Sequence, residues 1–215
     1  LVGVTVGALL PIANPISTAP VFVALTRTMS RERRNQQARM AAIYMACVLI
    51  VALLAGALIL KFFGISLPAL RIAGGLIIAR IGFGMLSPAE EEALPEQHRR
   101  EALDRTDVAF TPVAMPLLSG PGSIAVTISM ASSVDKITNF VPVCGGIVIV
   151  AFLSWLVLRS SSRVVAAMGS SGVKVLTRIM GLILVCVGIQ FVADGFIELL
   201  TDEAIVANFK AAYPR

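Results

Sequence analysis

Two short proline-rich clusters carry the polar groups best suited to bind a small molecule. Residues 11–17 read P-I-A-N-P-I-S, and residues 116–123, which start 105 residues later, read P-L-L-S-G-P-G-S. Proline removes a backbone donor and clashes with the preceding turn, so each cluster predicts an interrupted helix. The half-helix before a break ends in free carbonyls, which suit an ammonium group or Na⁺. The half-helix after it begins with free N–H groups and a positive dipole end, which suit a carboxylate.

The polar side chains of both clusters have roles that follow from these breaks. Asn14 and Ser119 stand just before a proline, where a helix N-cap is expected. The hydroxyls of Ser17, Thr18 and Ser123 come about one turn further along, and glycine lets the backbone approach a ligand closely. The predicted binding residues are Asn14, Pro15, Ser17, Thr18, Ser119, Gly120, Pro121, Gly122 and Ser123. The alternative is a packed proline kink whose hydroxyls bond their own helix.

The elements that position these clusters are predicted to be transmembrane helices. Of the 215 residues, 57% are hydrophobic and 14% are charged, which leaves too little polar surface for a soluble globule. A helix of about 20 apolar residues crosses a bilayer. Six segments qualify, at 1–26, 37–60, 67–87, 108–131, 140–158 and 175–200. The expected fold is an all-α membrane protein of six transmembrane helices, with helices one and four broken by the clusters.

The chain divides into two halves that resemble each other. A charged segment at 88–107 is expected to form a cytoplasmic linker between three-helix repeats at 1–87 and 108–215. Residues 71–74 (R-I-A-G) match residues 178–181 (R-I-M-G), an offset of 107 that agrees with the offset of the clusters. Because three spans is an odd number, the second repeat must be inverted relative to the first. Paired broken spans in inverted repeats are typical of a transporter whose substrate binds between the halves.

The basic residues predict the orientation in the membrane. Twelve Lys and Arg residues lie in or near the first, third and fifth loops, against five on the other side. The side with twelve is expected to be cytoplasmic, which places both termini on the outer, periplasmic side. The net charge of +5 is therefore attributed to membrane orientation, with membrane lipid as the expected partner. No nucleic-acid partner is expected.

Three residues inside the spans are candidates for ion coupling. Asp194 and Gln190 lie one turn apart in the outer half of span six, and Asp194 is the best-placed carboxylate for H⁺ or Na⁺. Arg80 lies eight residues before Pro88, or about 12 Å of helix from the cytoplasmic end. The alternatives are contact with headgroups for Asp194, and snorkelling or pairing with a cytoplasmic acid for Arg80. Because spans one to five hold no internal Asp or Glu, Na⁺ bound by carbonyls and hydroxyls fits as well as H⁺.

Three segments resemble the signature segments of the MarC family. They are LLPIANPISTAPVFVALT, LRIAGGLIIARIGFGML and AFTPVAMPLLSGPGSIA, and the resemblance covers essentially the whole chain. These bacterial and archaeal inner-membrane proteins are grouped with the LysE-type transporter superfamily. The resemblance implies a multi-pass inner-membrane protein that carries small neutral amino acids, such as glycine or alanine, with H⁺ or Na⁺. Arg80 departs from the pattern, because related sequences are apolar there.

The expected function is therefore alternating-access transport of a small neutral amino acid, with no cofactor and no metal. No strong charge is expected near the breaks, which suits a zwitterion. Efflux of drugs or other small metabolites is the first alternative, but it calls for an aromatic-rich cavity, and Trp155 is the only tryptophan. A non-transporting membrane scaffold is the second, and it leaves the paired breaks unexplained. An enzyme is not expected, because the sequence has no HExxH, no GxSxG and no paired intramembrane carboxylates.

Overall fold

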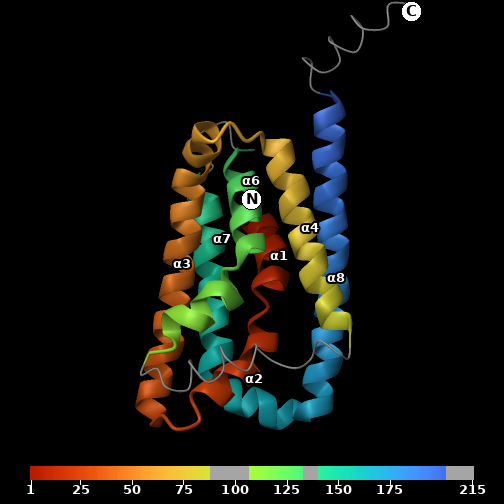
Figure 1. Ribbon diagram of the computed structural model, residues 1–215. Helices are drawn as coiled ribbons and strands as arrows, with labels where there is room; N and C mark the ends of the chain where they lie inside the picture. The colour runs from red at the N-terminus through yellow and green to blue at the C-terminus, as the bar shows by residue number, and fades with distance from the viewer. Residues whose placement is uncertain (88–106, 133–139, 202–215) are drawn as a thin grey trace, which may run out of the picture.

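The computed structural model describes residues 1–87, 107–132 and 140–201, and every regular element in these ranges is helical. The elements are α1 (Val2–Ala13), α2 (Pro15–Leu25), α3 (Arg31–Phe62), α4 (Leu67–Leu86), η2 (Ala109–Leu118), α6 (Pro121–Ser132), α7 (Phe140–Arg159) and α8 (Ser161–Thr201). Figure 1 shows the long helices side by side in one bundle, with α1 and α6 between α3 and α4. Most of the predicted linker, residues 88–106, lies outside the described residues.

Four helices are long and apolar enough to cross a membrane alone: α3, α4, α7 and the part of α8 from Ser171–Thr201. Two bent pairs qualify when each pair is taken as one span. The α1–α2 pair bends by 43°, and η2 with the first part of α6 bends by 63°. The structure therefore has four spans, or six when each bent pair is taken as one, which agrees with the six predicted spans, and the breaks in the first and fourth are confirmed. The outer surface suits hydrocarbon, because large apolar side chains such as Leu58, Phe62 and Val141 are more than two-thirds exposed, at 71%, 83% and 72%.

The last helix begins earlier than predicted. Residues 159–174 were expected to form a loop, but α8 starts at Ser161 and changes direction at Gly169, whose φ of 64° favours glycine. Its first turns lie across one end of the bundle (Figure 1). There Arg34 of α3 donates a hydrogen bond from its guanidinium to the Ser162 hydroxyl at 2.9 Å. We call this end, which holds the basic residues of 27–34 and 159–163, the basic end.

The core surrounds the broken spans. Leu9 of α1, Phe22 of α2, Leu49 of α3 and Ile147 of α7 are completely buried in a single apolar cluster. The contact between α1 and α7 is close, because a Cβ atom added at Gly146 would lie 2.5 Å from the Thr5 side chain. Long helices α3 and α7 therefore hold the short half-helices in place from one side.

Helices α4 and α8 pack from the other side through glycines. A Cβ at Gly75 would lie 2.5 Å from the Gly188 carbonyl oxygen, and a Cβ at Gly82 would lie 2.7 Å from the Gly181 carbonyl oxygen. The two backbones are therefore in direct contact, as membrane helices with small residues at their interface allow. The pairing of the earlier glycine with the later one shows that the helices are antiparallel, which Figure 1 also shows. We call Gly75, Gly82, Gly181 and Gly188 the glycine seam.

Candidate functional site

Asn14 forms the break between α1 and α2. Its φ of 37° and ψ of 63° lie in the left-handed region, which asparagine tolerates better than most residues. Its N–H donates to the Leu10 carbonyl at 2.9 Å and completes α1. Its side-chain oxygen accepts from the Ser17 N–H at 3.3 Å and caps α2. The predicted N-cap is confirmed, and one residue ends the first half-helix and starts the second.

The second break begins with the irregular helix η2. Its turns are wide, because the Val113 N–H donates to the Val108 carbonyl, five residues earlier, at 3.3 Å. Thr111 and Met115 are extended, with φ near −120° to −130° and ψ of 123°. Each precedes a proline, whose ring disfavours helical geometry in the residue before it.

Ser119 ends η2 rather than capping α6. Both its N–H and its hydroxyl donate to the Ala114 carbonyl, at 2.9 Å and 2.7 Å. Gly120 stands directly before α6, and its carbonyl accepts from the Ile124 N–H at 3.1 Å. The predicted N-cap role of Ser119 is therefore wrong, because Gly120, and not Ser119, is the residue directly before α6. A Cβ at Gly120 would lie 2.7 Å from the Pro116 carbonyl oxygen, so the turn accommodates glycine best.

The two breaks lie next to each other. A Cβ added at Gly122, in the first turn of α6, would lie 2.8 Å from the Ile78 side chain and 3.5 Å from that of Ile12. Ile12 is in the last turn of α1, so the end of one half-helix contacts the start of another. In Figure 1 the interruptions of the red and green segments lie near the same height of the bundle. The sequence expectation that paired breaks meet inside the protein is therefore consistent with this packing.

A partly open cavity of about 1560 Å³ lies beside the breaks. It is enclosed by α2, α4, the first residue of α6 and α8. It extends from Pro121, at the start of α6, to Ser87, after the end of α4, and to Val165, in the crossing part of α8. The cavity therefore connects the region of the breaks with the basic end. Its polar lining consists of Ser17, Arg80, Ser87, Lys174 and Thr177.

A pair of hydroxyls joins two walls of this cavity. The Ser17 and Thr177 side-chain oxygens are 3.0 Å apart and share a hydrogen bond between α2 and α8. Ser17 was predicted as a binding residue, and Pro121 of the second cluster also lines the cavity. Thr177 was not predicted, because the sequence carries no motif around it and the contact depends on how α8 packs.

The other predicted binding residues do not line the cavity, and several of their side chains bond to neighbouring protein groups instead. Asn14 is only 7% exposed, and its amide nitrogen lies 3.8 Å from the sulfur of Met85, which itself lines the cavity. The Thr18 hydroxyl donates to the Asn14 carbonyl at 3.2 Å, and the Ser123 hydroxyl donates to the Leu118 carbonyl at 3.4 Å. Pro15 is the buried first residue of α2. For Thr18 the structure thus matches the proline-kink alternative, whereas the Ser123 hydroxyl bonds across the break to the last residue of η2.

The lining of the cavity is positively charged. Arg80 of α4 and Lys174 of α8 both line it, and no Asp or Glu of the described ranges does. The sequence predicted no strong charge near the breaks, whereas the cavity that extends from the breaks to the basic end has two cations in its lining. Spacing along α4 does not reveal which face meets α8, and that packing decides where Arg80 points. Within residues 1–87, 107–132 and 140–201, Arg80 has neither an ion pair nor a hydrogen bond, whereas Lys174 already interacts with another group.

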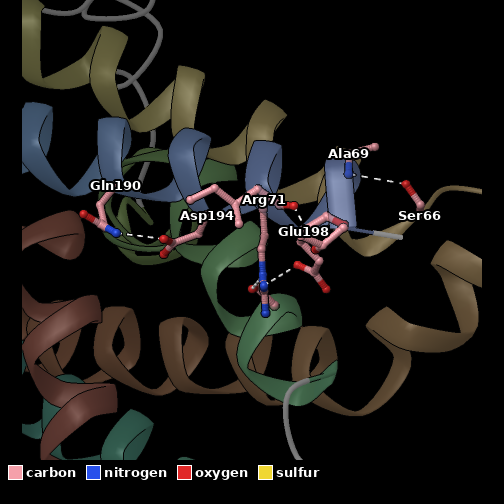
Figure 2. A network of polar contacts seen from close by, with 9 residues as sticks. Ser66, Ala69, Arg71, Gln190, Asp194 and Glu198 are labelled. Atoms are coloured by element: carbon pink, nitrogen blue, oxygen red, sulfur yellow. Dashed lines mark hydrogen bonds and ion pairs between the residues drawn. The ribbon is translucent and has the colours of Figure 1, made fainter. Parts of the chain in front are cut away.

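A polar network lies at the opposite end of the bundle. Arg71 of α4 donates from Nε to the Ser129 hydroxyl of α6 at 2.8 Å and forms an ion pair with Glu198 of α8. Figure 2 shows Arg71 and Glu198 together, with Gln190 and Asp194 further along α8. The Gln190 amide donates to the Asp194 carboxylate at 2.7 Å, and both residues are exposed. Neither lines the cavity, so the structure separates these two candidate coupling residues from Arg80.

Comparison with known proteins places the chain among integral membrane proteins. The family model described as "MarC family integral membrane protein" matches residues 2–200. The chain is 40% identical over 210 residues to the inner membrane protein MarC of Escherichia coli K12 and to that of Shigella flexneri. Each match covers 93% of this chain and 95% of the relative. No solved structure matches the chain at a significant level.

Proposed function

The chain belongs to the MarC family of integral membrane proteins, and from that starting point we propose that it transports small neutral amino acids. The proposed mechanism is alternating access in the inner membrane, with glycine and alanine as the expected substrates. The observation that carries the proposal is the cavity that reaches the paired helix breaks. Relatives are named inner membrane proteins, which supports the location. The substrate class follows from the family resemblance.

The two ends of the bundle differ in the way that alternating access requires. The cavity connects the breaks with the basic end, which we take as the cytoplasmic end because positive residues mark that side. At the other end, Arg71 links α4 to α6 and α8 through Ser129 and Glu198. This arrangement supports an inward-facing state, in which the substrate site opens to the cytoplasm while an ion pair closes the outer side.

The glycine seam supports two inverted halves that move against each other. Gly75 and Gly181 are 106 residues apart, and so are Gly82 and Gly188. This offset is one residue longer than that of the proline-rich clusters and one shorter than that of the R-I-A-G match, which pairs Gly181 with Gly74 instead of Gly75. In a two-fold arrangement, each residue of one half has an equivalent residue in the other half. A contact between two residues is then repeated between their two equivalents. The contacts of Gly75 with Gly188 and of Gly82 with Gly181 follow this rule. We propose that the halves rock about an axis through the seam.

We assign ion coupling, to H⁺ or Na⁺, to the polar face of α8 at the outer end. Gln190, Asp194 and Glu198 follow one another at intervals of four residues, so they share one face of the helix. Glu198 is paired with Arg71 in this state, and Asp194 accepts a hydrogen bond from Gln190 (Figure 2). A carboxylate beside a closing ion pair is well placed to respond when the outer side opens.

One observation favours the efflux alternative. The cavity volume of about 1560 Å³ exceeds the roughly 300–1,000 Å³ common for small-molecule sites. However, Phe83 is the only aromatic residue in the described lining, so the walls lack the stacking surfaces that suit drug-like compounds. A non-transporting scaffold explains neither the cavity nor the breaks. We therefore keep amino acid transport as the leading function and efflux as the second.

Uptake into proteoliposomes tests this proposal. We expect the reconstituted protein to accumulate labelled glycine and alanine when a H⁺ or Na⁺ gradient is imposed. Replacing both cavity hydroxyls, with Ser17→Ala and Thr177→Val, should lower uptake because it removes polar contacts from two walls. Thr201→Val, which removes an exposed hydroxyl outside the cavity, is the matched control and should have no effect. Absence of uptake, together with no thermal shift from any small amino acid, would exclude the function.

A further inference from the structure

Arg80 places a permanent positive charge on the wall of a largely apolar cavity. It lies six residues before Leu86, the end of α4, or about 9 Å inside the helix. Its neighbours in the lining include Ile77, Ile81 and Phe83. A charge within a membrane-spanning segment is costly and often marks a functional site. Because the described residues supply no partner for Arg80, a bound ligand is a suitable source of the missing negative charge.

We propose that Arg80, which stands where related sequences are apolar, gives this chain its own contact with the carboxylate of the transported substrate, an inference that rests on the proposed transport function. The guanidinium group is planar and presents paired N–H donors that match the two oxygens of a carboxylate. Arg80 is exposed in this open cavity, so solvent screens part of the attraction and the paired geometry of the donors supplies the selectivity for a carboxylate. The cavity would therefore accept small carboxylates and reject small cations.

The opposite walls supply what the rest of an amino acid needs. The Ser17 and Thr177 hydroxyls line the same cavity and carry oxygen lone pairs that accept hydrogen bonds from an ammonium group. Lys174 adds positive charge on the α8 wall and further disfavours a ligand without a carboxylate. This assignment replaces the half-helix N–H groups, which the sequence suggested for the carboxylate, with a side chain that reaches into the cavity.

Three probe molecules test which chemical group is recognised. The protein is placed in nanodiscs of phosphatidylcholine, and binding is measured for glycine, acetate and glycinamide. Glycine carries both groups, acetate only the carboxylate and glycinamide only the amine. We expect glycine and acetate to bind and to compete, and glycinamide not to bind. Binding of glycinamide as tight as that of glycine would overturn the proposal.

Variants at Arg80 locate the recognition. Arg80→Gln should weaken glycine and acetate binding by about 10-fold to 100-fold, as expected for loss of a charge-assisted contact. Arg80→Lys keeps the charge but loses the paired donors, so an intermediate loss is expected. Arg178→Gln is the control, because Arg178 is an exposed arginine of α8 that does not line the cavity. Unchanged glycine binding in Arg80→Gln, with intact thermal unfolding, would overturn the assignment and leave the transport function standing.

Two further outcomes separate the possible failures. Acetate binding that depends on Arg80, without any uptake of glycine or alanine, would support the carboxylate site and exclude the proposed substrate. A lipid headgroup can offer the same negative charge, so binding is repeated in nanodiscs that contain phosphatidylglycerol. If this lipid displaces acetate from the unmodified protein but not from Arg80→Gln, Arg80 binds lipid and the proposal is wrong.

Discussion

Adding one methyl group at Gly188 tests how closely α4 and α8 pack in the glycine seam. A Cβ atom at this position would lie 2.5 Å from the Ala79 nitrogen and 2.6 Å from the Gly75 carbonyl oxygen. Ordinary van der Waals contact begins at 3.4 Å. Both obstructing atoms belong to the backbone, so no side-chain rotation relieves the clash. The helices must move apart, and the contacts along the seam loosen.

The expected change in the free energy of unfolding for Gly188→Ala follows from two opposing effects. Overpacking a close-packed site costs about 1–3 kcal/mol. Replacing a glycine within a helix by alanine recovers about 0.5–1 kcal/mol. The net expectation for Gly188→Ala is a loss of up to about 2.5 kcal/mol in the free energy of unfolding, with a central value slightly above 1 kcal/mol. Gly82→Ala should behave alike, because its Cβ would lie 2.7 Å from both the Gly181 oxygen and the Val185 nitrogen.

The matched control is Gly145→Ala in α7. A Cβ there would meet only the Val2 side chain at 4.0 Å, so the helical gain should remain and the protein should be slightly stabilised. The measurement is unfolding in mixed micelles with increasing sodium dodecyl sulfate, followed by circular dichroism. If Gly188→Ala is as stable as the unmodified protein while Gly145→Ala behaves as expected, the seam is not in direct backbone contact and this packing argument fails.

Three further experiments address the breaks, the outer ion pair and the orientation. Asn14→Gly should lower the free energy of unfolding by only a few tenths of a kcal/mol. Asn14→Leu should lower it by about 2–3 kcal/mol, because leucine is strained in the left-handed conformation and cannot cap α2. Equal free energies of unfolding in the two variants would contradict this expectation. In a background without native cysteines, a cysteine introduced by Ser129→Cys reports access from the outer side to an impermeant maleimide added outside cells. Arg71→Gln should make this labelling faster. Unchanged labelling would argue against Arg71 as a residue that closes the outer side. In the same background, Ser66→Cys should react from outside and Arg163→Cys only after permeabilisation, and the reverse pattern would invert the proposed orientation.

The spans and their breaks could be predicted from the sequence because both are local properties. A run of about 20 apolar residues is long enough to cross a bilayer whatever surrounds it. A proline interrupts its own helix through its missing N–H and its ring. The capping role of Asn14 was predictable for the same reason, since its partner is the N–H of Ser17, three residues away.

Several sequence predictions were wrong although the residue types were suitable for the predicted role. Ser119 had the right type for an N-cap, but it lies one residue too early, because Gly120 stands directly before α6. Residues 161–168 were too polar for a span and were predicted as a loop, yet they form a helix that lies across the basic end. Thr18 and Ser123 had hydroxyls for a ligand, but Thr18 bonds within its own helix and Ser123 donates to the last residue of η2.

The sequence alone determined six spans, two matched interruptions and a family, because each depends on segment length, residue type and order. Only the tertiary structure decided that Ser17 meets Thr177, that Arg71 pairs with Glu198, and that a cavity lined by Arg80 joins the breaks to one end. These contacts join residues up to 160 positions apart. They depend on the rotation and depth at which α8 packs against its neighbours, and no single segment encodes that geometry.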